Sequence, residues 1–353
     1  MRVPTITLAL LVIAGLTASR DIPKPGADGR YTISATGIRA QFIPYGATLT
    51  NLFVNDKNGK EVDVVLGYDD ATYYPKDTSH PTYNSIPGRY ANRIGKAQFT
   101  IDGKSFKTQK NDGQNTLHSG TNNWSYRVWN VTAVSNDLIT FSLTDKEDES
   151  TGMPGLVNAN VTYSVFANGT WNIRMMANAP ETKTPLMLTH HTYFNLEAYK
   201  NPATALIWDH TLSIPYSKRY LAIDSNALPT GNILTAEAGS FRGNCGGSCE
   251  GYNGFWIFDD APKDAAVLTL ASPWSGIKAG LRTNQPGAVL YTCAWSDGTA
   301  SLKKTQGTGI AKKKMEKSTC IAIEAQDYDR IDAQITGPGE TDIWESSWAF
   351  GTL

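Results

Sequence analysis

The stretch Tyr163-Ser-Val-Phe-Ala-Asn-Gly-Thr-Trp-Asn-Ile-Arg-Met175 decides the fold class. Large apolar residues recur at every second position on both sides of its Asn168-Gly169 pair: Tyr163 and Val165 before it, and Trp171, Ile173 and Met175 after it. A period of two is typical of a strand with one buried face, and Asn-Gly is a favoured hairpin turn. The stretch therefore predicts two antiparallel strands joined by a tight turn.

The same pattern recurs along the chain. Asn58-Gly59 and Asp102-Gly103 are further two-residue hairpin signals flanked by strand-like residues. No long stretch shows the period of a helix with caps at both ends, and the 31 glycines and 17 prolines are scattered without a linker-like concentration. The acidic run at residues 145–150 is interpreted as a solvated loop. These features predict an all-β protein built as one large antiparallel β-sandwich.

The composition limits the possible partners. The chain has 353 residues, of which 41% are hydrophobic, so it can form a substantial core. Its 32 basic and 33 acidic residues give a net charge of -1. Such a balance gives no electrostatic reason to bind nucleic acid or an anionic membrane. We therefore expect the partner to be a small, neutral molecule.

The first residues have the features of a secretory signal. Arg2 supplies a positive charge, residues 6–14 form a short apolar run, and Thr17-Ala-Ser19 offers small residues for cleavage. The apolar run is shorter than the roughly 20 residues that a membrane span needs. We expect residues 1–19 to be a cleaved signal peptide and residues 20–353 to form the mature, secreted domain, with no membrane attachment after cleavage.

Two further features agree with export. The sequon Asn-X-Ser/Thr occurs at Asn123, Asn130, Asn160 and Asn168, so some of these residues are expected to carry glycan in a eukaryotic secretory route. The four cysteines are Cys245, Cys249, Cys293 and Cys320. They allow three pairings, one of which closes a small loop between Cys245 and Cys249 and leaves Cys293 with Cys320. Zinc binding is the alternative, but predicted export favours disulfides.

Four segments contain the candidate chemistry: residues 88–95 (GRYANRIG), 115–120 (NTLHSG), 188–196 (LTHHTYFNL) and 320–326 (CIAIEAQ). In the last segment, Glu324 follows an apolar run and is expected at or near the end of a buried strand. A carboxyl group there needs partners, or its pKa rises through desolvation. A structural salt bridge or a solvent-facing position is the alternative interpretation.

The histidines also allow more than one interpretation: a catalytic, a metal-binding or a structural role. His190 and His191 are adjacent, and neighbours on a strand point to opposite faces, so only one of the two is expected to enter a given site. Histidine is the side chain best suited to proton exchange near neutral pH. His118, His191 and Glu324 are also ligand types that zinc accepts, and their spacing does not exclude a metal site. Hydrogen-bonded structural histidines are the remaining alternative.

Taken together, the four segments resemble those of the aldose 1-epimerase (galactose mutarotase) family. Ser119 stands where the family's Asn-x-Leu-His-Gly-Gly segment has its first glycine, and His190 stands where asparagine is usual. The resemblance extends from about Tyr31 to Gly351. It implies the galactose-mutarotase type of β-sandwich and an enzyme that needs neither metal nor cofactor.

The resemblance also implies roles for particular residues. His191 would be the general acid, Glu324 the general base, and His118 a supporting hydrogen-bond donor. Asn92 and Arg93 would hold sugar hydroxyls. The implied reaction interconverts the α and β anomers of free aldohexoses such as glucose and galactose by acid–base ring opening and reclosure.

Two positions depart from the family pattern. Asn253 stands where the family has an aspartate that contacts sugar hydroxyls, and Val289 stands where it often has glutamine. These changes leave the preferred sugar open and motivate an alternative, a non-catalytic secreted carbohydrate-binding protein. A glycosidase is a further alternative, but it normally pairs two carboxylates, and the four segments offer no convincing second one.

Overall fold

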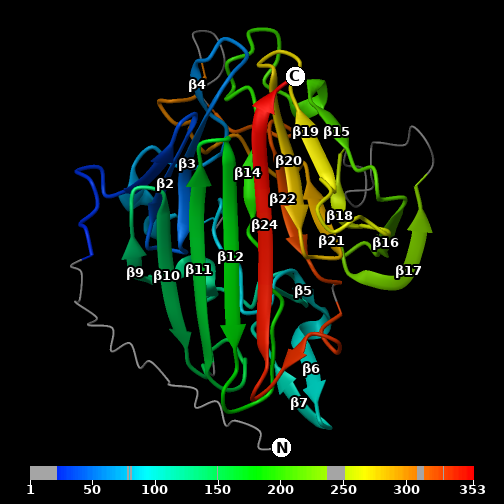
Figure 1. Ribbon diagram of the computed structural model, residues 1–353. Helices are drawn as coiled ribbons and strands as arrows, with labels where there is room; N and C mark the ends of the chain where they lie inside the picture. Colours follow the sequence, from blue (N-terminus) through cyan, green and yellow to red (C-terminus); the bar gives the residue numbers. More distant parts are fainter. Residues whose placement is uncertain are drawn as a thin grey trace, which may run out of the picture.

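The computed structural model describes residues 22–77, 79, 82–148, 150–236, 251–307, 314–328 and 330–353. Almost all of its regular structure is antiparallel β-sheet (Figure 1), so the predicted all-β fold is confirmed. The expected signal peptide and the Cys245–Cys249 pair lie outside the described residues. Within those residues, no helix has the length and apolar character that a membrane span requires.

The largest sheet has eight strands, and the long β24 lies near its middle (Figure 1). In spatial order its strands are β15 (Thr211–Ser213), β19 (Leu268–Ala271), β20 (Ile277–Thr283), β24 (Thr341–Thr352), β12 (Thr170–Asn178), β11 (Val157–Phe166), β10 (Leu138–Asp145) and β9 (Asn130–Val134). A second sheet has six strands: β14 (Thr192–Phe194), β22 (Ile321–Gln326), β21 (Gly287–Tyr291), β18 (Asn253–Ile257), β16 (Arg219–Ile223) and β17 (Pro229–Thr235).

Smaller elements complete the fold. A four-stranded sheet contains β1 (Tyr31–Ala35), β2 (Ile38–Ile43), β3 (Thr48–Asn55) and β4 (Glu61–Asp63). Three strand pairs are β5 (Arg93–Ile94) with β8 (Thr116–Leu117), β6 (Gln98–Ile101) with β7 (Lys104–Lys107), and β13 (Thr184–Pro185) with β23 (Ile335–Thr336). Short 3-10 helices are η1 (Ala71–Lys76), η2 (Gly95–Ala97), η3 (Trp124–Tyr126) and η4 (Ile207–Asp209).

The two large sheets pack face to face through the alternating residues of their strands. The Trp344 indole of β24 donates to the carbonyl of Ala325 in β22 at 2.8 Å, and the Phe194 ring lies 4.8 Å from that of Trp348. Ile321 and Ile323 belong to the same buried core. Because alternate residues of a strand face opposite sides, Glu324 lies on the face of β22 that points away from the eight-stranded sheet.

The three predicted hairpins form, with different loop lengths. Ile101 pairs with Lys104 around a two-residue loop, and both Asp102 and Gly103 have the positive φ angles that a type I′ turn needs. Phe166 pairs with Thr170, which leaves three residues in the loop at Asn168-Gly169. The loop at Asn58-Gly59 has five residues, since Asn55 pairs with Glu61. The prediction of two-residue loops was wrong for these two turns.

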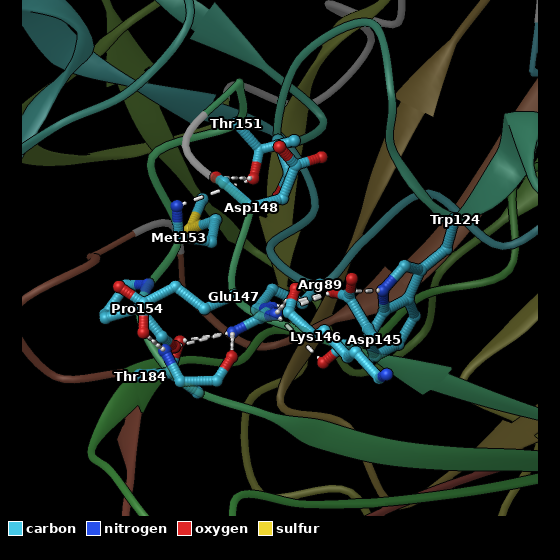
Figure 2. A network of polar contacts seen from close by, with 12 residues as sticks. Arg89, Trp124, Asp145, Lys146, Glu147, Asp148, Thr151, Met153, Pro154 and Thr184 are labelled. Atoms are coloured by element: carbon cyan, nitrogen blue, oxygen red, sulfur yellow. Dashed lines mark hydrogen bonds and ion pairs between the residues drawn. The ribbon is translucent and has the colours of Figure 1, made fainter.

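A buried network around Arg89 fixes the segment that leads to Asn92 and Arg93 (Figure 2). The Arg89 side chain is 1% exposed and donates to a carboxylate oxygen of Asp145 at 2.9 Å. It also donates to the Pro154 carbonyl at 2.7 Å and the Thr184 hydroxyl at 3.0 Å. The partners come from β10, β13 and the chain before β11, so this one guanidinium ties residues 88–95 to the sandwich.

Asp145 is the anion of this network. Its carboxylate accepts from the Trp124 indole at 2.8 Å and also pairs with Arg127. The interpretation of residues 145–150 as a solvated loop was wrong for Asp145, because it is the last residue of β10 and is buried. The guanidinium groups of Arg89 and Arg127 neutralise the Asp145 charge, and the Trp124 indole donates a hydrogen bond to it. The carboxylate therefore does not need the solvent that the sequence-based interpretation assumed.

We predict that Asp145→Ala lowers the free energy of unfolding by about 3–5 kcal/mol, because it leaves the buried Arg89 charge without its anion. Glu345→Ala is the matched control, since it breaks the exposed Arg174–Glu345 ion pair and should cost less than about 1 kcal/mol. Urea unfolding curves measure both. Equal losses in the two variants would show that the Arg89 network does not stabilise the fold as described.

Candidate active site

A pocket of about 350 Å³ opens on the face of the six-stranded sheet that carries Glu324. All six predicted site residues line it: Asn92, Arg93, His118, His191, Asn253 and Glu324. They come from five separate parts of the chain: the start of β5 with the residue before it, the residue after β8, the residue before β14, and the strands β18 and β22. The structure thus brings together every residue that the sequence singled out.

Glu324 and His191 form the centre of the pocket. A carboxylate oxygen of Glu324 lies 3.2 Å from Nε2 of His191, and both side chains are buried. Glu324 is the fourth of six residues in β22, whose residues are all buried. The expectation of a position at or near the end of a buried strand is confirmed: β21 pairs with β22 from Ala322 to Gln326, and the strand ends two residues after Glu324.

Burial shifts both groups toward their neutral forms. It raises the pKa of the Glu324 carboxyl to about 8, although the nearby Arg93 charge opposes the rise. It lowers the pKa of the His191 imidazole to about 3. Desolvation disfavours the charged form of each group, and their contact allows one proton to be shared. Between these two pKa values both groups are therefore neutral, so the carboxyl group is a proton donor and the unprotonated imidazole nitrogen is an acceptor.

The backbone separates the two adjacent histidines as predicted. The His191 amide donates to the Ser85 carbonyl at 3.0 Å, and its ring stacks on Tyr193 with centroids 4.7 Å apart. His190 instead lies in the core, with its ring 5.6 Å from that of Tyr163 and 5.5 Å from that of Trp171. Only His191 lines the pocket.

His118 is held in one tautomer by Asn92. The Asn92 amide donates to Nδ1 of His118 at 3.0 Å, and the His118 amide donates to the Asn92 carbonyl at 2.8 Å. Because Nδ1 accepts a backbone N–H, the ring proton is on Nε2. Burial lowers the pKa of His118 well below its usual range, and the neighbouring His191 and Arg93 add to the effect. His118 is therefore a neutral hydrogen-bond donor.

Ser119 supports this arrangement. Its φ is 66°, a conformation that favours the glycine found there in the family pattern. The Ser119 hydroxyl accepts from the Tyr90 amide at 2.9 Å and donates to the Tyr90 carbonyl at 3.0 Å. These two bonds to the segment that carries Asn92 offset the backbone strain. The serine therefore leaves the position of His118 intact.

Arg93 has a partner that the sequence did not reveal. Its Nε donates to the Asp112 carboxylate at 2.8 Å, from the loop that precedes β8. Among the described residues only this nitrogen of Arg93 has a hydrogen-bond acceptor, so the two terminal nitrogens can serve other acceptors. No pattern marks Asp112, since it lies in an irregular loop and approaches Arg93 only after β5 pairs with β8. Tyr193, Tyr291 and Trp295 also line the pocket and were not predicted.

The two unusual positions lie on neighbouring strands, where Asn253 pairs with Tyr291, two residues from Val289. Asn253 begins β18, and its side-chain amide nitrogen has no hydrogen-bond partner among the described residues. Val289 pairs in register with Glu324 and lines the pocket beside it. The wall next to the carboxyl group thus combines one unused amide donor with an apolar surface.

One disulfide and one sequon also concern this region. Cys293 and Cys320 are joined, as in one of the three possible pairings, and the bond links the chain after β21 to the start of β22.

Asn123 lines the pocket and is 2% exposed. Its side chain donates to the Gly120 carbonyl at 2.7 Å and accepts from the Ser125 amide at 2.8 Å. The folded protein therefore has no room for glycan at Asn123.

Comparisons with known proteins agree with this geometry. The family model for aldose 1-epimerase matches residues 29–341. A probable aldose 1-epimerase from Arthroderma benhamiae is 35% identical, over 84% of this chain and 78% of the relative. Galactose mutarotase from Sus scrofa is 32% identical, over 79% of this chain and 82% of the relative. The crystal structure of an aldose epimerase homologue from C. elegans has a TM-score of 0.81 and 27% identity, over 92% of this chain and 99% of that chain. The chain therefore belongs to the aldose 1-epimerase family.

Proposed function

We propose that this protein is a mutarotase that interconverts the α and β anomers of free aldohexoses such as glucose and galactose. The observation that carries the proposal is the buried His191–Glu324 pair, whose nearest side-chain atoms lie 3.2 Å apart in a pocket lined with polar groups. A binding protein needs hydrogen-bond donors and acceptors but no such pair. Burying two titratable groups costs free energy, so their presence favours a catalyst over the carbohydrate-binding alternative.

The reaction uses the pair as base and acid. With a pyranose bound, the proton of the Glu324 carboxyl group moves across the 3.2 Å contact to His191. The Glu324 carboxylate then takes the proton of the C1 hydroxyl, and His191 gives its proton to the ring oxygen. The bond between C1 and the ring oxygen breaks, and the open-chain aldehyde forms. After rotation about the C1–C2 bond, the hydroxyl that was formed from the ring oxygen attacks the other face of C1. Its proton returns to His191, Glu324 returns the other proton to the new C1 hydroxyl, and the enzyme ends as it began.

The surrounding residues stabilise the charge that develops on oxygen. His118 presents a fixed Nε2–H, because Asn92 holds its Nδ1. Arg93 adds a cation whose position Asp112 fixes. Donors that are already in place need no reorganisation during the reaction. In this proposal Asn92, Arg93 and Asn253 bind sugar hydroxyls, and no step requires a cofactor.

We predict that Glu324→Gln and His191→Asn each lower the mutarotation rate of glucose and galactose by roughly 10²–10⁴-fold. Glutamine keeps the shape of Glu324 but cannot accept the proton, and asparagine cannot transfer one to the ring oxygen. The double variant should lose little more than either single variant, because the two groups act in one cycle. Polarimetry of freshly dissolved α-anomers measures the rates.

Two controls make this test decisive. His118→Asn should reduce the rate less, because a donor remains at that position. A chelator distinguishes the zinc alternative, since the ligand atoms of His118, His191 and Glu324 lie within 4.8 Å of one another. Unchanged activity in Glu324→Gln, or loss with chelator that zinc restores, would mean that the acid–base assignment is wrong.

We further propose that the protein is exported, with residues 1–19 removed and residues 20–353 forming the mature domain. The features that support this proposal are Arg2, the apolar run and the small residues before position 20. Asn130 and Asn168 are exposed and suit glycosylation. N-terminal sequencing of protein from the native source should give a start near Arg20. Cytoplasmic protein that retains Met1 would contradict export.

A further inference from the structure

The order of strands in the six-stranded sheet determines how a bound sugar lies. Strand β22, which carries Glu324, lies between β14 and β21. His191 precedes β14 on one side of it, and Val289 of β21 pairs with Glu324 on the other. The proposed reaction places C1 at Glu324 and the ring oxygen at His191. Because C1 is bonded to the ring oxygen and to C2 within the ring, C2 and its substituent are directed toward β21 and β18.

The wall on that side of the pocket offers one polar and one apolar group. Asn253 of β18 is 9% exposed, and its side-chain nitrogen has no hydrogen-bond partner among the described residues. Val289 lines the pocket beside it with methyl groups. A hydroxyl group on C2 can accept from the amide but gains nothing from the valine. The wall therefore suits a substituent that combines a hydrogen-bond acceptor with an apolar group.

A small niche opens behind this wall. It has a volume of about 20 Å³ and shares four lining residues with the reaction pocket, Asn253 and Val289 among them. The other residues that line it have no polar side chain: Leu221, Ile223, Ala227, Pro229, Gly254 and Phe255. Roughly 10–15 Å³ is enough for one water-sized group, so the niche has room for a methyl group.

We propose that this enzyme acts on 2-acetamido-2-deoxyaldohexoses such as N-acetylglucosamine, and that Asn253 and Val289 determine this specificity. This inference rests on the mutarotase function proposed above. The Asn253 amide donates to the acetyl carbonyl, and the acetyl methyl packs on Val289 and enters the niche. The acetamido group is not altered in the reaction, so the proton transfers at Glu324 and His191 are those described for glucose.

The charge of the site distinguishes the acetamido group from a free amine. Arg93 lines both the pocket and the niche. A free 2-amino group provides neither a carbonyl for Asn253 nor a methyl for the niche. Its positive charge would also face the Arg93 guanidinium, and like charges at short range repel. The neutral amide of N-acetylglucosamine avoids this repulsion, so the parent enzyme should prefer N-acetylglucosamine to glucosamine.

The test compares kcat/KM for N-acetylglucosamine with kcat/KM for glucose, both by polarimetry after subtraction of the uncatalysed rate. In Asn253→Asp the ratio of the two values should fall by roughly tenfold or more, because a carboxylate cannot donate to the acetyl carbonyl and repels it. In Val289→Gln the ratio should fall by roughly threefold or more, because the longer side chain takes the place of the acetyl methyl.

Asn136→Asp is the matched control. Asn136 is exposed between β9 and β10 and lies outside the pocket residues. Its substitution adds the same charge to the protein as Asn253→Asp does. Its ratio should equal that of the parent, and a fall as large as that of Asn253→Asp would show that the effect does not arise in the pocket.

Other outcomes separate this inference from the proposed function. A parent enzyme that is active on glucose but not on N-acetylglucosamine, or a ratio unchanged in either pocket variant, overturns the acetamido site and leaves mutarotation intact. A parent without activity on any sugar overturns the proposed function. Calorimetry then decides the acetamido site independently: N-acetylglucosamine must bind the parent at least fivefold more tightly than it binds Asn253→Asp, and equal affinities refute the site.

Discussion

Glu324 carries a carboxyl group in the middle of a strand that is buried along its whole length. Pairing of β22 with β14 on one side and β21 on the other fixes the backbone around it. The alternation of the strand then sends Ile323 and Ala325 into the core and Glu324 out of it. The carboxyl group is neither solvated nor matched by a contacting cation. His191 provides the missing partner, because its neutral imidazole can accept the proton that burial keeps on the Glu324 carboxyl group.

The rest of the site depends on holding these two groups at a fixed position relative to the residues that we propose bind the sugar. Arg89 anchors the segment that ends in Asn92 and Arg93 to β10. Reciprocal bonds between Asn92 and His118 join that segment to the chain after β8. Buried ion pairs and backbone hydrogen bonds thus fix the positions of the polar groups in the site. Such preorganisation is what electrostatic catalysis requires.

The sequence was sufficient for the features that follow from local patterns. Period-two alternation around Asn168-Gly169 identifies β11 and β12. Strand geometry predicted that only one of His190 and His191 enters the site, and this holds although both residues precede β14. Features that depend on long-range contacts were not accessible. Asp145 looked like part of a solvated run because its partner Arg89 is 56 residues away. Trp295 belongs to no motif, and its place in the pocket wall arises only when β21 and β22 pair. Asn253 and Val289 were identified only through the family pattern.

We propose that one proton, shared by Glu324 and His191, makes the site active. The most direct test is the pH dependence of kcat/KM, with the rate of the uncatalysed reaction subtracted. Above a pKa of about 8 the shared proton is lost and no acid remains, and below about 3 a second proton binds and no base remains. We predict a plateau of kcat/KM between these values and a tenfold fall per pH unit outside them, over the pH range in which the protein stays folded. A maximum confined between the ordinary pKa values of glutamic acid and histidine, about 4.3 and 6.5, would contradict it.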